Sequence, residues 1–148
     1  MKNTLPSAIS GKVDLLLKEA RVRHQSGDVA GAIVSALSAW ELLPEPRLDW
    51  DFYPQIMTRG LVGFYVEVND QTNARKWIEV MANAYDDPNH EDHLVLMVEG
   101  EAYHHLGERE RATYVFTRIF EIYGENGFEG DQKQFLALYV HEQAGTQR

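Results

Sequence analysis

One pattern, a tight turn followed by an acidic residue and then an alanine, occurs three times in this chain of 148 residues. Gly or Asn makes the turn, Asp or Glu follows it directly, and the alanine comes four residues after the acidic residue. The three copies are Gly27-Asp28 with Ala32, Asn69-Asp70 with Ala74, and Gly107-Glu108 with Ala112, at intervals of 42 and 38 residues. An internal repeat of this length predicts a fold made of stacked copies of one small unit.

Apolar residues between these turns recur at steps of three and four, and the alternation typical of β-strands is almost absent. This period predicts an all-α fold. We expect three antiparallel helix hairpins and a C-terminal capping helix, over residues 12–44, 51–85, 91–123 and about 131–143. Asp28 and Asp51 are the expected caps of the second and third helices, because a carboxylate can accept an unpaired backbone N–H.

Composition limits both the number of domains and the kind of partner. Hydrophobic residues make up 44% of the chain, enough for one compact core, so we expect a single domain over residues 1–148. The formal net charge of -9 disfavours nucleic acid and anionic membranes as partners and favours a basic protein. The chain has no Cys, no apolar run typical of a signal peptide and no stretch that approaches a membrane span, so we expect a cytoplasmic protein.

The order of small and aromatic residues in the third copy resembles the tetratricopeptide repeat family. That copy contains Gly100, Tyr103, Leu106-Gly107, Ala112 and Phe116, and the first copy adds Ala20, Gly27, Ala32, Ala39 and Pro44. The middle copy departs from the family pattern, with Val62 and Met81 where small residues are usual. The resemblance implies an α-solenoid whose concave side binds peptides or protein domains.

Two further segments are similar to small bacterial repeat proteins encoded beside polymorphic toxins. These are the run from Ala39 to Pro46 followed by Trp50, and the ending from Phe128 to Leu136. This resemblance implies an immunity protein that binds and neutralises a cognate secreted antibacterial toxin, for which a basic nuclease is one candidate. The alternative is a chaperone or adaptor of a bacterial secretion system, which would hold an extended segment of its client.

Catalysis has no positive signal in the sequence, which lacks a nucleophile elbow, a phosphate-binding glycine loop and a dinucleotide fingerprint. A small hydrolase or metalloenzyme that uses the histidine-rich stretch is the remaining enzyme hypothesis. However, His90 and His93 lack the spacing of a zinc helix and are expected in a solvated loop. His104 and His105 should lie on different helix faces, and Glu99 with Glu101 should form a solvated acidic face. We therefore expect no catalytic residue, no metal and no cofactor.

The expected binding surface combines carboxylates with aromatic side chains. Its residues are Asp49, Trp50, Asp51, Glu67, Glu101 and His104. Carboxylates speed the encounter with a basic partner, and a central aromatic residue slows its release. The alternative for the segment from Asp49 to Tyr53 is that Trp50 and Tyr53 pack between repeats. The sequence leaves open the identity of the partner, the face that binds it, and the oligomeric state.

Overall fold

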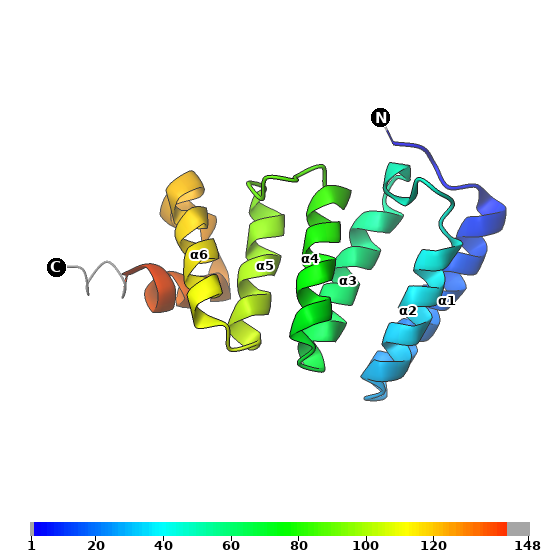
Figure 1. Cartoon of the computed structure of the whole chain (residues 1–148), viewed down its shortest axis with the longest axis horizontal. Coiled ribbons are helices and arrows are strands. Elements are labelled where there is room, and N and C mark those ends of the chain that lie inside the picture. Colours follow the sequence, from blue (N-terminus) through cyan, green and yellow to red (C-terminus); the bar gives the residue numbers. More distant parts are fainter. Residues whose placement is uncertain (1, 142–148) are drawn as a thin grey trace. The chain divides into compact units, whose positions relative to one another are not determined.

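The computed structural model describes residues 2–141, and the regular elements in that range are helices. The long helices are α1 (Ser7–Gln25), α2 (Val29–Leu42), α3 (Tyr53–Glu67), α4 (Gln71–Ala84), α5 (His93–His105) and α6 (Arg109–Tyr123). They pack in antiparallel pairs, α1 with α2, α3 with α4, and α5 with α6 (Figure 1). The expected all-α class and the three hairpins are confirmed.

The three repeated turns have the same backbone geometry. Gly27, Asn69 and Gly107 all have a positive φ, of 88°, 56° and 75°. In each turn the next residue donates its N–H to the carbonyl five residues earlier, at 2.8–2.9 Å. This arrangement satisfies carbonyls at the helix end that would otherwise lack a partner. The repeat read from the sequence is therefore present in the backbone.

Carboxylates begin several of the helices. Asp28 accepts the N–H of Gly31 at 2.9 Å, and Asp70 and Asp92 cap α4 and α5 in the same way. The expectation for Asp51 is wrong. The residue before α3 is Phe52, and no side chain caps that helix. Asp51 instead begins a tight turn in which its carbonyl accepts the N–H of Tyr53, so that Phe52 takes the position before the helix.

Small residues lie where the helices of a hairpin approach each other. The repeated alanines Ala32, Ala74 and Ala112 have no exposed surface. In the third hairpin a β-carbon at Gly100 would lie 2.8 Å from the Phe116 ring, which is closer than real β-carbons come. The glycine therefore allows the aromatic ring of α6 to fill the space against α5.

The C-terminal segment covers α6, but it is not one regular helix. Two short 3₁₀ turns, η2 (Gly124–Gly127) and η3 (Gly130–Gln132), lead into α7 (Lys133–Phe135) and a π-helical turn η4 (Leu136–His141). Phe135 stacks on Phe116 with ring centroids 4.6 Å apart, and Tyr139 stacks on it at 5.1 Å. The expected cap is thus present as an irregular helical segment; residues 142 and 143 lie outside the described range.

The chain divides into two compact units, which we call unit 1, up to Asp86, and unit 2, from Asp87 onward. Unit 1 holds two hairpins, with α2 packed on α3 and Trp40 meeting Trp77 edge to face at 5.2 Å. Unit 2 holds the third hairpin and the C-terminal segment. The expectation of a single domain stays a prediction. Over residues 2–141, none of the helices has both the length and the apolar character of a bilayer span.

Candidate binding site

The first connection between hairpins, residues 43–52, carries three of the expected site residues. It contains the 3₁₀ turn η1 (Arg47–Asp49) and is braced by the N-terminal segment. Asn3 donates its N–H to the carbonyl of Asp49 at 2.9 Å and accepts the N–H of Asp51 at 2.7 Å. These two bonds fix the backbone on both sides of Trp50. The backbone positions from which the side chains of Trp50 and Asp51 extend are therefore defined.

The side chains of this connection have different roles. The Trp50 ring is partly buried, and its N–H donates to the carbonyl of Pro44 at 2.8 Å, so its polar edge is used within the connection. Asp49 and Asp51 are exposed, and within residues 2–141 their carboxylates make no hydrogen bond or ion pair. Two cations reach this connection, and both have other partners. Arg47 pairs with Glu41 and Glu45, and Lys2 donates to the Leu48 carbonyl and pairs with Asp86.

Phe52 projects from the same connection, although it was not among the expected site residues. Its φ is 72° and its ψ is -55°, and Tyr53 donates its N–H to the carbonyl of Asp51 at 2.8 Å. This is a γ-turn with Phe52 at its centre. The Phe52 side chain is 54% exposed. The sequence gives no signal for this turn, because a bulky apolar residue does not favour a positive φ.

Glu67 lies at the end of α3 and pairs with His24 at the end of α1. The His24 Nε2 atom is 2.9 Å from both carboxylate oxygens, and the ring lies 5.2 Å from that of Phe64. Both partners are well exposed, at 38% and 46% of their side-chain surface. Glu67 therefore already has a partner within unit 1, unlike Asp49 and Asp51.

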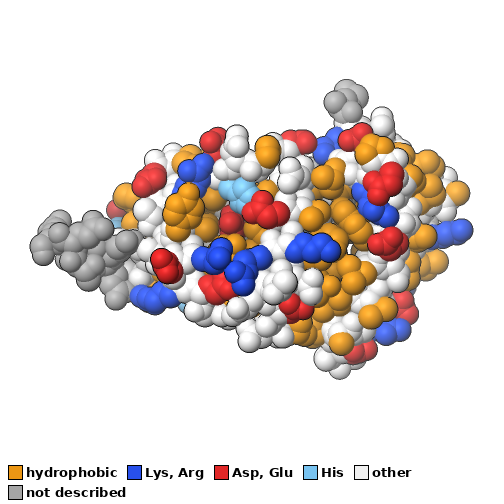
Figure 2. Space-filling view, viewed as in Figure 1, with side chains coloured by type: hydrophobic (Ala, Val, Ile, Leu, Met, Phe, Trp, Pro, Cys, Tyr) orange, Lys and Arg blue, Asp and Glu red, His pale blue; other side chains and the backbone are white. Residues whose placement is uncertain are grey.

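A shallow groove of about 170 Å³ lies beside this pair in unit 1. It is mostly apolar and is lined by residues of α1, α2 and α3: Leu17, Ala20, Arg21, His24, Ala36, Ile56, Met57, Gly60, Leu61 and Phe64. On the face of unit 1 that Figure 2 shows, hydrophobic side chains gather between α2 and α4. Acidic and basic side chains are interspersed on that face (Figure 2).

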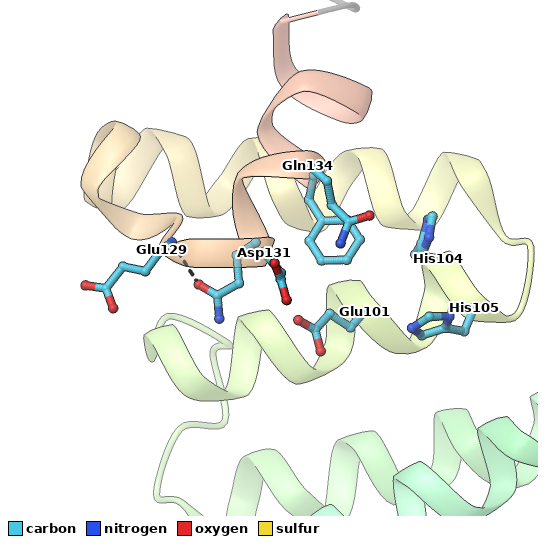
Figure 3. Close-up of a pocket in the computed structure, with 8 residues that line it drawn as sticks. Glu101, His104, His105, Glu129, Asp131 and Gln134 are labelled. Atoms are coloured by element: carbon cyan, nitrogen blue, oxygen red, sulfur yellow. Dashed lines mark hydrogen bonds between the residues drawn. The ribbon is translucent and has the colours of Figure 1, made fainter.

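Glu101 and His104 meet in a pocket of about 380 Å³ in unit 2. The pocket lies between α5 and the C-terminal segment and is lined also by His105, Glu129, Asp131, Gln132, Gln134 and Phe135. Glu101 and Asp131 point into the same space, and Gln132 accepts the N–H of Glu129 at its edge (Figure 3). The structure thus joins two of the expected site residues with carboxylates of the C-terminal segment that the sequence did not single out.

Burial shifts the protonation of both expected residues in this pocket. It raises the pKa of Glu101, an effect that the neighbouring His105 opposes. Burial also lowers the pKa of His104, with further contributions from His105 and Arg109. The His104 Nδ1 atom is 2.6 Å from the Tyr139 hydroxyl, so the ring holds the C-terminal segment against α5.

His104 and His105 are expected on different helix faces, and an α-helix does separate consecutive residues by about 100°. Both rings nevertheless line the pocket of unit 2, with centroids 5.1 Å apart. Among residues 2–141, no three His, Asp or Glu side chains are grouped so that they could hold a metal ion.

The second connection between hairpins, residues 85–92, is held internally. His90 Nδ1 lies 2.8 Å from a carboxylate oxygen of Glu99, and His93 Nε2 lies 2.6 Å from the carbonyl of Gly127. Glu99 is only 8% exposed. The expectations of a solvated loop for these histidines and of a solvated Glu99 are therefore wrong, because the connection folds back onto α5 and places His90 over that carboxylate.

Comparison of the chain with protein-family models, with curated proteins and with solved structures gives no match. The resemblances to repeat proteins and to immunity proteins stay predictions.

Proposed function

We propose that this chain is a protein-binding module of the tetratricopeptide type and acts as an immunity protein that neutralises a cognate bacterial toxin. The observation that carries the proposal is the pair of exposed carboxylates, Asp49 and Asp51, neither of which forms an ion pair within the described residues. In a chain of net charge -9, such groups attract a basic protein and speed its association. Toxins that attack nucleic acid are commonly basic.

A repeat architecture supports the proposal. The three turns share one backbone geometry, and the hairpins place small residues at their crossings. Repeated hairpins of this kind can stack into a solenoid, in which each unit contacts its neighbours and leaves extended faces for a partner.

The test is co-expression in bacteria with each toxin encoded beside this gene. We expect the chain to restore growth against one of them and to co-purify with it. If it neither restores growth nor binds any adjacent toxin, the immunity function is wrong.

A chaperone or adaptor of a secretion system is the second candidate, and the apolar groove of unit 1 favours it. Leu17, Ile56 and Phe64 line a surface that an extended client segment could cover. A chaperone would increase the secretion of its client without protecting cells from it. Measuring secretion and survival in the same strain therefore separates the two functions.

A further inference from the structure

The γ-turn at Phe52 is a strained way to begin a helix. A positive φ brings the β-carbon close to the backbone, so non-glycine residues adopt it at a cost in free energy, and γ-turns of this sign are rare. Three other non-glycine residues of the described range have a positive φ: Asn69, Asp86 and His90. These types tolerate the left-handed region better than other side chains do. Phe52 is the bulky apolar exception.

The ring contact of Phe52 is with its sequence neighbour Tyr53, at a centroid distance of 5.3 Å, and 54% of the residue is exposed. This contact by itself does not explain why a bulky side chain occupies the turn. A glycine would adopt the same backbone with less strain. A large apolar side chain at a strained, exposed position points to contact with a partner.

The surroundings of Phe52 are acidic. Asp51 directly precedes it and Asp49 lies three residues before it; both are exposed, and neither forms an ion pair within residues 2–141. Tyr53 donates its hydroxyl to Asp14 of α1 at 2.8 Å, which brings a third carboxylate to this side of unit 1. An aromatic ring bordered by carboxylates is complementary to a surface where Lys or Arg surrounds an apolar recess, since the cations can pair with the carboxylates and lie over the ring.

We infer that Phe52, presented by this strained turn, is the anchor that inserts into a basic surface of the partner protein. The inference rests on the proposed function, since it specifies how the toxin is held. It assigns the anchor to Phe52 in place of Trp50, because the Trp50 ring is partly buried and its N–H is bound to Pro44. The bracing of the connection by Asn3 keeps the ring in place before the partner arrives.

The test uses the adjacent toxin that the chain neutralises and three variants of the full chain. Phe52→Gly removes both the ring and the strain, and Phe52→Ala removes the ring and keeps a β-carbon. Both should weaken binding at least about tenfold. Phe52→Gly should also raise the melting temperature, whereas Phe52→Ala should leave it nearly unchanged. The matched control is Tyr114→Ala, which removes an aromatic side chain that is 69% exposed on α6 and should leave binding unchanged.

The possible outcomes decide between the two proposals. Lost binding in a Phe52→Gly variant that is more stable than the natural chain cannot come from unfolding and supports the inference. If the toxin binds the natural chain and both Phe52 variants equally well, the inference is wrong and the immunity function stands. A lower melting temperature for Phe52→Gly would contradict the strain on which the inference depends. If no adjacent toxin binds the natural chain, the function and the inference fail together.

Discussion

The two connections between hairpins use similar residues in opposite ways. Each is rich in carboxylates and contains non-glycine residues held at positive φ, Phe52 in the first, and Asp86 and His90 in the second. His90 turns inward, to 2.8 Å from the buried Glu99 carboxylate. Phe52 turns outward, and 54% of the residue is exposed. His90 therefore gains a polar contact within its own unit that offsets its backbone strain, whereas the ring contact of Phe52 is with its sequence neighbour Tyr53.

The carboxylates differ in the same way. Asp87 in the second connection accepts the N–H groups of Glu91 and Asp92 at 2.9–3.0 Å, and Glu91 lies 3.6 Å from Arg118. Asp49 and Asp51 in the first connection have no such partners in the described part of the chain. Acidic composition alone therefore does not mark a binding surface. What distinguishes the first connection is that the carboxylates of Asp49 and Asp51 have no partner among the described residues and that Phe52 is more than half exposed.

The largest effect is expected for the buried contact of the second connection. His90→Ala removes a hydrogen bond to a carboxylate that is 8% exposed, and should destabilise unit 2 by about 2–3 kcal/mol. His24→Ala is the control. It removes a His–Glu contact of nearly the same length at an exposed position and should cost at most about 1 kcal/mol. Equal losses would mean that burial does not strengthen the His90–Glu99 contact over the exposed His24–Glu67 contact.

The measurement can also test the expectation of a single domain. All three tryptophans, Trp40, Trp50 and Trp77, lie in unit 1, so tryptophan fluorescence reports that unit. Circular dichroism reports the helices of both units. If His90→Ala shifts both signals together, the units unfold as one domain. If only part of the dichroism transition shifts and the fluorescence does not, they unfold separately.

A second effect concerns Asp87. Replacement by Ala removes the acceptor of two backbone N–H groups and should cost about 1–2 kcal/mol of stability. Asp51→Ala, measured by the same chemical denaturation, should stay within about 0.5 kcal/mol of the natural chain, because its exposed carboxylate has no partner in residues 2–141. A loss for Asp51→Ala as large as that for Asp87→Ala would show that the first connection depends on its carboxylates for folding.

A third effect separates the connections in binding. The double variant Asp49→Lys with Asp51→Lys should associate about tenfold more slowly with the toxin that this chain neutralises, at low salt, and the difference should shrink at high salt. Its free energy of unfolding should be nearly unchanged. Glu110→Lys combined with Glu121→Lys is the control, because it changes the net charge equally from exposed positions on α6. Stopped-flow mixing gives both rates. If both double variants slow association equally, the effect comes from net charge, and Asp49 and Asp51 are not part of the binding surface.

The sequence was informative where local chemistry decides the structure. Gly27, Asn69 and Gly107 favour the turn geometry that they adopt, and the apolar period predicted the hairpins. The sequence was not informative where a contact outside the local segment decides the structure. His90 lies over Glu99 because the second connection folds back onto α5, and neither residue type favours that contact locally.

The candidate site shows the same limit. Its charges could be read from the sequence, as at Asp49 and Asp51. The positive φ of Phe52 could not, because its local preference opposes that conformation. The pocket of unit 2 could not be read either, because Asp131 reaches Glu101 only through the irregular C-terminal segment.

The smallest expected effect is a dependence of stability on pH. It also determines the pH at which His90→Ala and His24→Ala should be compared. The folded chain holds the pKa of His104 below its ordinary value of 6.5, chiefly through burial. This residue therefore contributes stability above pH 6.5, and that contribution is lost as the pH falls through the lowered pKa. Glu101 in the same pocket acts in the opposite sense, because its raised pKa means that its protonated form is favoured by folding.

We expect His104→Gln to lose less stability than the natural chain between pH 8 and pH 5. The difference should be less than about 1 kcal/mol in denaturation curves followed by circular dichroism. Glu101→Gln should lose more over the same range. Identical pH dependence in all three proteins would show that the pocket does not titrate with folding. If the predicted differences are found, His90→Ala and His24→Ala should be compared at pH 8, where His104 is neutral in both the folded and the unfolded chain and cannot add to the loss assigned to His90.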